Sequence, residues 1–295
     1  MYKEAGKIIY SPTDITTYMS SPFASWMNRF RIDSPENAPS IDEDDALNLS
    51  LSKRGLDHEE NLLSELGNHG KTIASITEEK LGKNASFEKK NTATIDAMAA
   101  GYDVVFQAAL ELSSFRGYAD FLIKVPGESK FGDYHYEVWD TKLASKVKPY
   151  FVIQLCCYAE MLEQIQGVRP KNIVVALGNG NNETLNTENY FYYYLSLKEQ
   201  FLSSQKLFNP NLTPNPADSK SYGRWSNYAE QILEEKDHLS LIANITRSQV
   251  KKLNQAGVIT CDELIKLKDI KIPGLNESIL KSLKAQATIQ NESNG

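Results

Sequence analysis

Two adjacent segments with alternating side chains constrain the fold of this chain more than any other feature. Residues 117–125 and 134–143 both match the two-residue period of a β-strand, in which successive side chains point to opposite faces. The residues between them, PGESKFGD, are rich in turn formers and predict a hairpin. The hairpin would place Asp120 beside Asp140 on neighbouring strands, so two carboxylates are expected to lie close together.

Further polar side chains are expected at the same point. Lys142 follows Asp140 by two positions and therefore shares its face of the strand. The next segment predicts a helix, in which Gln154 and Tyr158 are four residues apart and share one helix face. His58 lies on an earlier predicted helix. Acids, a lysine, an imidazole and a polar helix pair thus belong to one predicted site.

This combination of side chains suits a divalent metal. Sites rich in carboxylate oxygens prefer Mg²⁺ or Mn²⁺ to Zn²⁺, and a nitrogen from His58 would shift the preference toward Mn²⁺. The chemistry that fits is phosphodiester hydrolysis. A bound ion polarises the phosphoryl oxygen and lowers the pKa of a water, while Lys142 steadies the attacking water and the developing charge.

In order and spacing, these segments resemble the RecB-type branch of the PD-(D/E)xK nucleases. More narrowly, they resemble the nuclease module of bacterial nuclease–helicase proteins. In that branch a helix histidine precedes a G-x-x-D strand, a D/E-x-K strand and a helix with Q-x-x-x-Y. The resemblance covers residues 1–202 and rests on four matches: His58, Gly117 to Asp120, Asp140 to Lys142, and Gln154 to Tyr158.

The resemblance implies a fold and a set of roles. The fold would be α/β and restriction-endonuclease-like, with a mixed central sheet flanked by helices. Lys142 would be the catalytic lysine, and Gln154 and Tyr158 would orient it or contact DNA. The metal, Mg²⁺ or Mn²⁺, would be held by four groups: His58, Asp120, Asp140 and the backbone carbonyl of Thr141.

Each motif taken alone has a simpler explanation. His58 lies on a helical stripe with Leu62 and Leu66, where a histidine is more often packed in the core than bound to metal. A lone D-x-K arises by chance in most chains of this length, and a Gln–Tyr pair is usually a half-exposed helix face. The joint occurrence favours the site. Four other acids are expected to be solvated or to cap helices: Asp14, Asp57, Glu59 and Asp103.

The chain departs from the family in one respect. Many RecB-type nucleases join their N- and C-terminal segments through an iron–sulfur cluster held by four cysteines. The matching positions here lack thiols: Ser21, Ser219, Tyr222 and Tyr228. The only cysteines lie elsewhere in the sequence: Cys156, Cys157 and Cys261. We therefore expect no iron–sulfur cluster, and predict that aromatic packing takes its mechanical role, through Trp26, Tyr222, Trp225 and Tyr228.

The C-terminal part predicts a separate all-α unit. Its helical periodicity is interrupted at Gly257 and again at Gly274. This resembles a helix–hairpin–helix unit, whose glycine turns present backbone N–H groups to DNA phosphates. A small helical packing domain explains the pattern equally well. We expect four parts: a nuclease core over 1–202, a loop and connecting helix over 203–240, the helical unit over 241–288, and a polar tail over 289–295.

The remaining segments carry weaker signals. Residues 178–189, GNGNNETLNTEN, predict a turn-rich excursion, and residues 33–48 a loop. Aromatic enrichment in YFYYYLSL, residues 190–197, predicts a strand. Further helices are expected over 11–30, 49–67, 72–82 and 92–100, and further strands over 102–112 and 172–178.

Composition bounds the class of protein. The 295 residues are 41% hydrophobic, enough for one core and a small satellite domain. No apolar run approaches the roughly 18 residues of a membrane span, and no signal sequence is recognisable, so a cytoplasmic location is expected. The net charge of −6 is unusual for a DNA-binding protein, but residues 246–287 carry eight Lys or Arg against four Asp or Glu.

These observations predict a metal-dependent deoxyribonuclease, an exonuclease acting on single-stranded or frayed DNA in repair or defence. The chain contains no G-x-x-x-x-G-K-[ST] loop, so a helicase motor is expected in the same longer polypeptide or in a separate subunit. Two alternatives stay open. One is a catalytically silent DNA-binding or scaffolding module with a nuclease fold. The other is a nuclease that acts on RNA, because nothing in the sequence, such as an identifiable 2′-hydroxyl reader, separates an RNA substrate from a DNA substrate.

Overall fold

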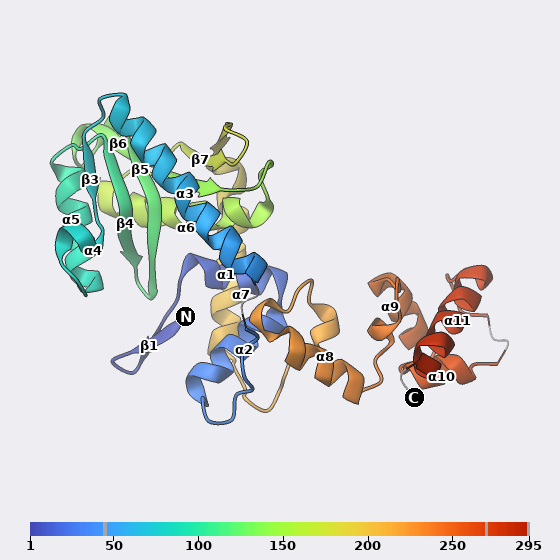
Figure 1. The fold of residues 1–295 in the computed structure, drawn as a ribbon. Helices are drawn as coiled ribbons and strands as arrows, with labels where there is room; N and C mark the ends of the chain where they lie inside the picture. The colour runs from blue at the N-terminus through green and yellow to red at the C-terminus, as the bar shows by residue number, and fades with distance from the viewer. Residues whose placement is uncertain (44–45, 269–270, 294–295) are drawn as a thin grey trace. The chain divides into compact units, whose positions relative to one another are not determined.

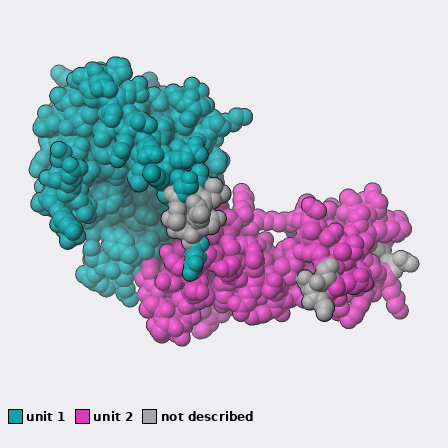
Figure 2. All heavy atoms as spheres, in the orientation of Figure 1, with its two compact units in different colours: residues 1–19, 43–208 teal, residues 20–42, 209–295 magenta. Residues whose placement is uncertain are grey.

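The computed structural model describes residues 1–43, 46–268 and 271–293 (Figure 1). Contacts between residues divide the chain into two compact units, shown in different colours in Figure 2. Unit 1 comprises residues 1–19 and 43–208, and unit 2 comprises residues 20–42 and 209–295. Residues 20–42 therefore group with the C-terminal segment and not with the core in which the sequence placed them.

Unit 1 is built on a mixed six-stranded sheet with the order β3-β4-β5-β6-β7-β8. Parallel pairing joins β3 to β4 and β6 to β7, and the other neighbours are antiparallel. The prediction of an α/β fold with a mixed, helix-flanked sheet is confirmed. The strands are β3 (Ile73–Ser75), β4 (Val104–Leu112), β5 (Phe115–Ser129), β6 (Gly132–Lys142), β7 (Asn172–Leu177) and β8 (Asn182–Asn186).

Helices cover both faces of this sheet (Figure 1). On one face, α3 (Ala46–Asn68) packs its leucines against Phe121 and the neighbouring strand residues. On the other, α5 (Phe87–Ala99) and α6 (Pro149–Gln166) pack against Leu122 and the residues that alternate with it. The change of face between Phe121 and Leu122 is the two-residue period that the sequence predicted.

The β5–β6 hairpin is present, but its turn is shorter than predicted. Ser129 pairs with Gly132, so β5 runs through most of the segment that was expected to be turn. The register shifts between Pro126 and Ser129. Proline has no N–H to donate to the ladder, and a bulge accommodates that loss without ending the strand.

The prediction of a strand at residues 190–197 is wrong, because this segment belongs to the helix α7 (Glu188–Lys206). Its aromatic residues suggested a strand, but its buried side chains recur every three or four positions, which is the helical period. Those side chains are Phe191, Tyr194, Leu197 and Phe201.

Two other local predictions are also corrected. The expected helix over 72–82 is instead β3 followed by α4 (Glu78–Leu81), and β8 lies within the expected turn-rich excursion. Both strands are short and exist through pairing with a partner, β3 with β4 and β8 with β7. A strand that depends on its partner in this way shows little alternation in its own sequence, so it is hard to predict.

The N-terminal segment begins with the β1–β2 hairpin (Tyr2–Glu4 and Lys7–Ile9), followed by two helices where one was expected. These are α1 (Pro12–Ser20) and α2 (Pro22–Asp33). The break falls at Ser21, whose hydroxyl caps α2 by accepting a hydrogen bond from the Ala24 N–H at 2.9 Å.

Unit 2 contains two separate apolar clusters. In the first, Phe23, Ala24 and Met27 of α2 pack with Trp225 and Ala229. The aromatics of the predicted cluster meet here, since Trp26, Tyr222 and Tyr228 pack around the buried Trp225. This cluster explains why residues 20–42 group with the C-terminal segment. It includes residues of η2 (Gly223–Trp225) and α8 (Ser226–Glu235).

The second cluster forms the core of the C-terminal helices. These are α9 (Arg247–Gln255), α10 (Cys261–Lys266) and α11 (Glu277–Ser293), preceded by the short helices η1 (Pro216–Asp218) and η3 (Leu239–Leu241). The expected polar tail is corrected in part, because α11 continues to Ser293 and the Gln290 side chain bonds to the backbone of Leu241 and Ala243. No helix within the described ranges is long and apolar enough to cross a membrane.

Candidate active site

Asp120 and Asp140 lie across from each other on β5 and β6. Phe121 pairs with Trp139, which places the two aspartates one step beyond this pair on adjacent antiparallel strands. Asp140 is only 2% exposed, and Lys142 Nζ lies 2.6 Å from its Oδ2. Apart from this ion pair, Oδ2 has no hydrogen-bond partner among the described residues. The structure therefore brings together both acids and the lysine that the sequence singled out.

Asp120 is anchored to the strand that carries Asp140. Its Oδ2 accepts hydrogen bonds from the Thr141 backbone N–H at 2.8 Å and from the Thr141 hydroxyl at 3.0 Å. Thr141 in turn pairs with Ala176 of β7. The carboxylate thus ties the G-x-x-D strand to the D-x-K strand through one threonine.

Tyr158 connects α6 to the same strand. It is buried, and its hydroxyl donates a hydrogen bond to the carbonyl of Tyr118 at 2.7 Å. Burial, followed by the nearby charge of Asp140, raises the pKa of Tyr158 well above its ordinary value. The hydroxyl therefore stays protonated. Gln154, half-buried one turn earlier, interacts with the Tyr158 hydroxyl, so the two members of the predicted helix pair meet.

The glycine of the G-x-x-D motif is required by this tyrosine. A Cβ built on Gly117 would lie 2.9 Å from both Cε1 and Oη of Tyr158. Such distances are too short for real carbon contacts, so any larger residue would displace the ring. Two motifs far apart in sequence are thus joined by one contact.

Glu59 is a site residue that the sequence analysis assigned to solvent or helix capping. It is 9% exposed and accepts a hydrogen bond from the Gln107 side-chain amide. Burial, reinforced by the charge of Asp120, raises the pKa of Glu59 to about 7. Its position next to His58 was the one available signal in the sequence.

Gln107 was not foreseen at all. It lies in β4 between Phe106 and Ala108, which pair with the residues on either side of Asp120. Its φ is +54°, a left-handed conformation that is uncommon for a residue with a side chain. Strained backbone of this kind concentrates at functional sites. Here it accompanies a side chain that holds the Glu59 carboxylate.

The site carries more negative than positive charge. Burial, then repulsion from Asp120, raises the pKa of Asp140 to about 7, although Lys142 opposes the shift. Three carboxylates, those of Glu59, Asp120 and Asp140, thus influence one another around a single lysine. Oxygen donors with excess negative charge, including a buried carboxylate oxygen with one ion pair, fit a hard divalent cation such as Mg²⁺ or Mn²⁺.

His58 is half-buried on α3 and is engaged elsewhere. Its Nε2 lies 3.2 Å from the carbonyl oxygen of Ala176 on β7. In the part of the chain that the structure describes, no three His, Cys, Asp or Glu side chains lie close enough together to hold a metal ion. The carboxylates are thus neighbours, but a coordination sphere that includes His58 is not assembled.

Three other acids lie outside the site; Asp14 and Asp57 behave as the sequence analysis expected, whereas Asp103 neither caps a helix nor is fully solvated, because it also pairs with Lys124 at 3.0 Å. Asp14 accepts hydrogen bonds from the backbone N–H and hydroxyl of Ser11 at the start of α1. Asp103 accepts two from Thr72, and these lower its pKa. Asp57 is exposed. These carboxylates serve local structure.

The two glycines assigned to DNA contact lie in unit 2. Gly257 and Gly274 have φ of +82° and +73°, so both turns use the conformation that favours glycine. The Gly274 carbonyl accepts a hydrogen bond from Lys252 Nζ at 2.6 Å. Helix, glycine turn and helix therefore follow one another as predicted, while contact with DNA stays a prediction.

The cysteines belong to different units. Cys156 and Cys157 are buried on α6 in unit 1, where burial raises the pKa of both thiols to about 12. Cys261 begins α10 in unit 2. At the positions that matched cluster ligands, Ser219 Oγ instead accepts a hydrogen bond from the Phe23 N–H at 3.3 Å. This bond joins the N-terminal and C-terminal segments of unit 2.

No protein-family model matches this chain, and no curated protein matches it in sequence. The resemblance to RecB-type nucleases therefore rests on the motif residues themselves.

Proposed function

We propose that this protein is a metal-dependent nuclease with a restriction-endonuclease-like core of the RecB type, and that it hydrolyses phosphodiester bonds in DNA. The observation that carries the proposal is the grouping of Asp120, Asp140 and Glu59 around Lys142. Carboxylates with raised pKa values beside a lysine are a common signature of catalytic sites.

The order of elements supports the same proposal. The histidine helix α3 precedes the strand with Asp120, which precedes the strand with Lys142 and then the helix with Tyr158. That order was expected from the resemblance. The antiparallel β5–β6 pair brings the acids together, and the helix after β6 returns its polar pair to the same strands.

The residues have distinct proposed roles. Asp120 and Asp140 would hold Mg²⁺ or Mn²⁺ with the Thr141 carbonyl, and His58 is proposed as the nitrogen ligand. Glu59 adds a third carboxylate near these ligands, where its charge and that of Asp120 influence each other. When bound, the ion supplies Lewis-acid polarisation of the phosphoryl oxygen and a water of lowered pKa.

Lys142 and the α6 pair complete the site. The Lys142 ammonium lies beside Asp140, where it can hold the attacking water and stabilise charge that develops on the phosphate. Tyr158 stays a neutral donor and, through Tyr118, keeps α6 attached to the strand that carries Asp120. Gln154 positions the tyrosine ring.

The test is degradation of end-labelled single-stranded DNA in Mg²⁺, Mn²⁺ or EDTA. The wild-type protein is expected to cleave only with metal, and Lys142→Ala and Asp140→Ala are expected to abolish cleavage while the fold is retained. The product ladder shows whether cleavage begins at an end. DNA binding without cleavage under any metal would overturn the proposal in favour of a silent binding module. Preferential cleavage of an RNA strand of the same sequence would overturn the assignment to DNA.

The wider setting belongs to the same proposal. A nuclease of this kind would act in the cytoplasm, in DNA repair or defence, on ends opened by a helicase motor. Adding such a motor with ATP is expected to extend cleavage from frayed to fully paired ends. If the protein digested fully paired DNA without a motor, the proposed dependence on a helicase would be contradicted.

A further inference from the structure

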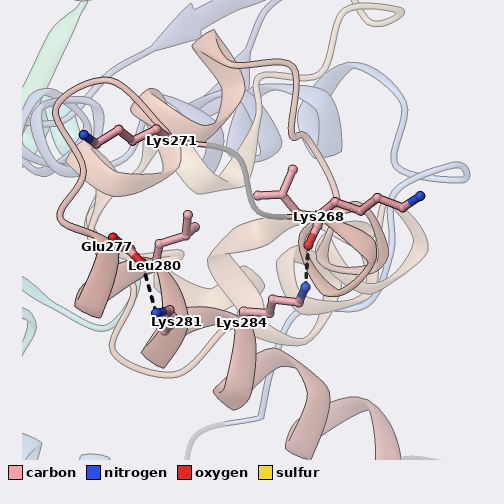
Figure 3. A pocket seen from close by; sticks show the side chains of 7 residues that line it. Lys268, Lys271, Glu277, Leu280, Lys281 and Lys284 are labelled. Atoms are coloured by element: carbon pink, nitrogen blue, oxygen red, sulfur yellow. Dashed lines mark hydrogen bonds and ion pairs between the residues drawn. The ribbon is translucent and has the colours of Figure 1, made fainter.

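A lysine-lined pocket lies in unit 2 between the end of α10 and the helix α11. Its volume is about 250 Å³, and four of its seven lining residues are lysines. Figure 3 shows it from close by. Three of the lysines are exposed and one is half-buried. They are Lys268, Lys271, Lys281 and Lys284.

Among the residues that the structure describes, three acids lie near this pocket, and each has a partner. Glu277 pairs with Lys281 at 2.9 Å, and Asp262 pairs with Lys266 at 2.7 Å. Glu263 completes the capping box of α10 by accepting backbone N–H groups. Lys268 and Lys271 form no ion pair with any residue in the described ranges. Glu277 therefore neutralises one pocket lysine, Lys281, while Lys268, Lys271 and Lys284 keep positive charge that none of these described acids pairs with.

One lysine of the pocket, Lys284, is restrained by a hydrogen bond. Lys284 Nζ donates a hydrogen bond to the carbonyl of Leu267, which follows the last turn of α10. This bond restrains the ammonium beside the pocket. A ligand that meets it need not order the side chain, so less conformational entropy is lost on binding.

The direction of the side chains indicates the shape of the ligand. Figure 3 shows Lys268 and Lys271 extending to opposite sides, with Lys281 and Lys284 between them. Ammonium groups that converge would enclose one small anion. Groups that spread across a surface match a chain of anions, as in the phosphates of a nucleic-acid strand.

We propose that this lysine surface binds the backbone phosphates of a single nucleic-acid strand, as a substrate contact separate from the acidic site. The inference rests on the proposed function in that it takes nucleic acid as the substrate. Contacts of this type position a strand without reading its sequence. They also account for basic residues gathering in the C-terminal helices of an acidic protein.

The test is the salt dependence of DNA binding in EDTA, where cleavage does not occur. Fluorescence anisotropy of labelled single-stranded DNA is measured for the full chain and for Lys268→Gln/Lys271→Gln. The control Lys236→Gln/Lys266→Gln makes the same charge change on exposed lysines of unit 2 outside the pocket. We expect the pocket variant to bind about tenfold more weakly, with a salt slope smaller by about 1.4, as for two lost phosphate contacts.

Three results would overturn the inference. One is an equal loss in the control pair, and another is an unchanged slope in the pocket variant. The third is displacement of DNA by sodium phosphate beyond the effect of sodium chloride at equal ionic strength, which would indicate a small-anion site. Failure of the nuclease proposal is distinguishable from these results. In that case wild type does not cleave with any metal, yet the pocket variant still loses DNA binding.

Discussion

Asp120 and Thr141 link the two strands of the candidate site through a side chain. One carboxylate oxygen of Asp120 accepts both the Thr141 backbone N–H and its hydroxyl. The bond fixes the spacing between the acid of one motif and the peptide that joins Asp140 to Lys142. Among the described residues the second oxygen of Asp120 accepts no such bond, which leaves it for other partners, such as a metal ion.

Removing each part of this link should have a different effect. Thr141→Val keeps the backbone bond and loses the hydroxyl bond, at a cost of about 1 kcal/mol in unfolding free energy. Cleavage should fall only a few-fold, whereas Asp120→Asn should abolish it. Cleavage rates and denaturant unfolding of both variants test this. Equal loss of activity in the two variants would contradict this expectation, because the hydroxyl bond would then matter as much as the carboxylate charge.

Gly117→Ala should destabilise the protein, because its new methyl group would overlap the Tyr158 ring. Overpacking of this kind costs about 1–3 kcal/mol, and each kcal/mol lowers the Tm of a domain of this size by about 2–4 °C. Gly55→Ala is the matched control, since a Cβ there meets no atom within 4 Å on a helix. It should leave the Tm unchanged or raise it. Thermal melts of the two variants that coincide would refute the contact.

The metal-free protein should lose stability as the pH rises. Glu59 and Asp140 have pKa values of about 7 in the folded state, against ordinary values of 4.5 and 3.8. Between about pH 4 and pH 7, the folded state therefore binds more protons than the unfolded state. Their contribution to stability is complete below about pH 4 and lost as the pH rises through 7.

Melting temperatures in EDTA from pH 5 to pH 8 check this dependence. Glu59→Gln should flatten the profile and raise the Tm at pH 8, and added Mn²⁺ should raise the wild-type Tm there. A Tm that climbs with pH in EDTA would contradict the raised pKa values. Glu60→Gln, which changes an exposed acid in the same helix, is the control.

Loss of the aromatic cluster should loosen unit 2. Tyr222→Ala and Tyr228→Ala each remove a ring that packs around Trp225, and we expect a loss of about 1–3 kcal/mol for each. Tyr192→Ala removes a ring that is 72% exposed on α7 and should leave stability unchanged. Unchanged melting of both cluster variants would refute the view that this packing joins α2 to the C-terminal segment.

Much of the site could be predicted from local pattern. Alternation along two strands and a short connection place Asp120 opposite Asp140, since antiparallel pairing follows directly from a hairpin. Helical spacing places Gln154 and Tyr158 on one face. These relationships depend on residues that are near in sequence, so the sequence alone determined them.

Other features were decided only by contacts between distant segments. Glu59 becomes a site residue because β4 brings Gln107 to it, and β3 is a strand because β4 pairs with it. The α7 segment is a helix because its buried stripe packs on the core, which outweighs its aromatic strand propensity. Burial and pairing partners are non-local properties, and the tertiary structure supplies them where a run of residues does not.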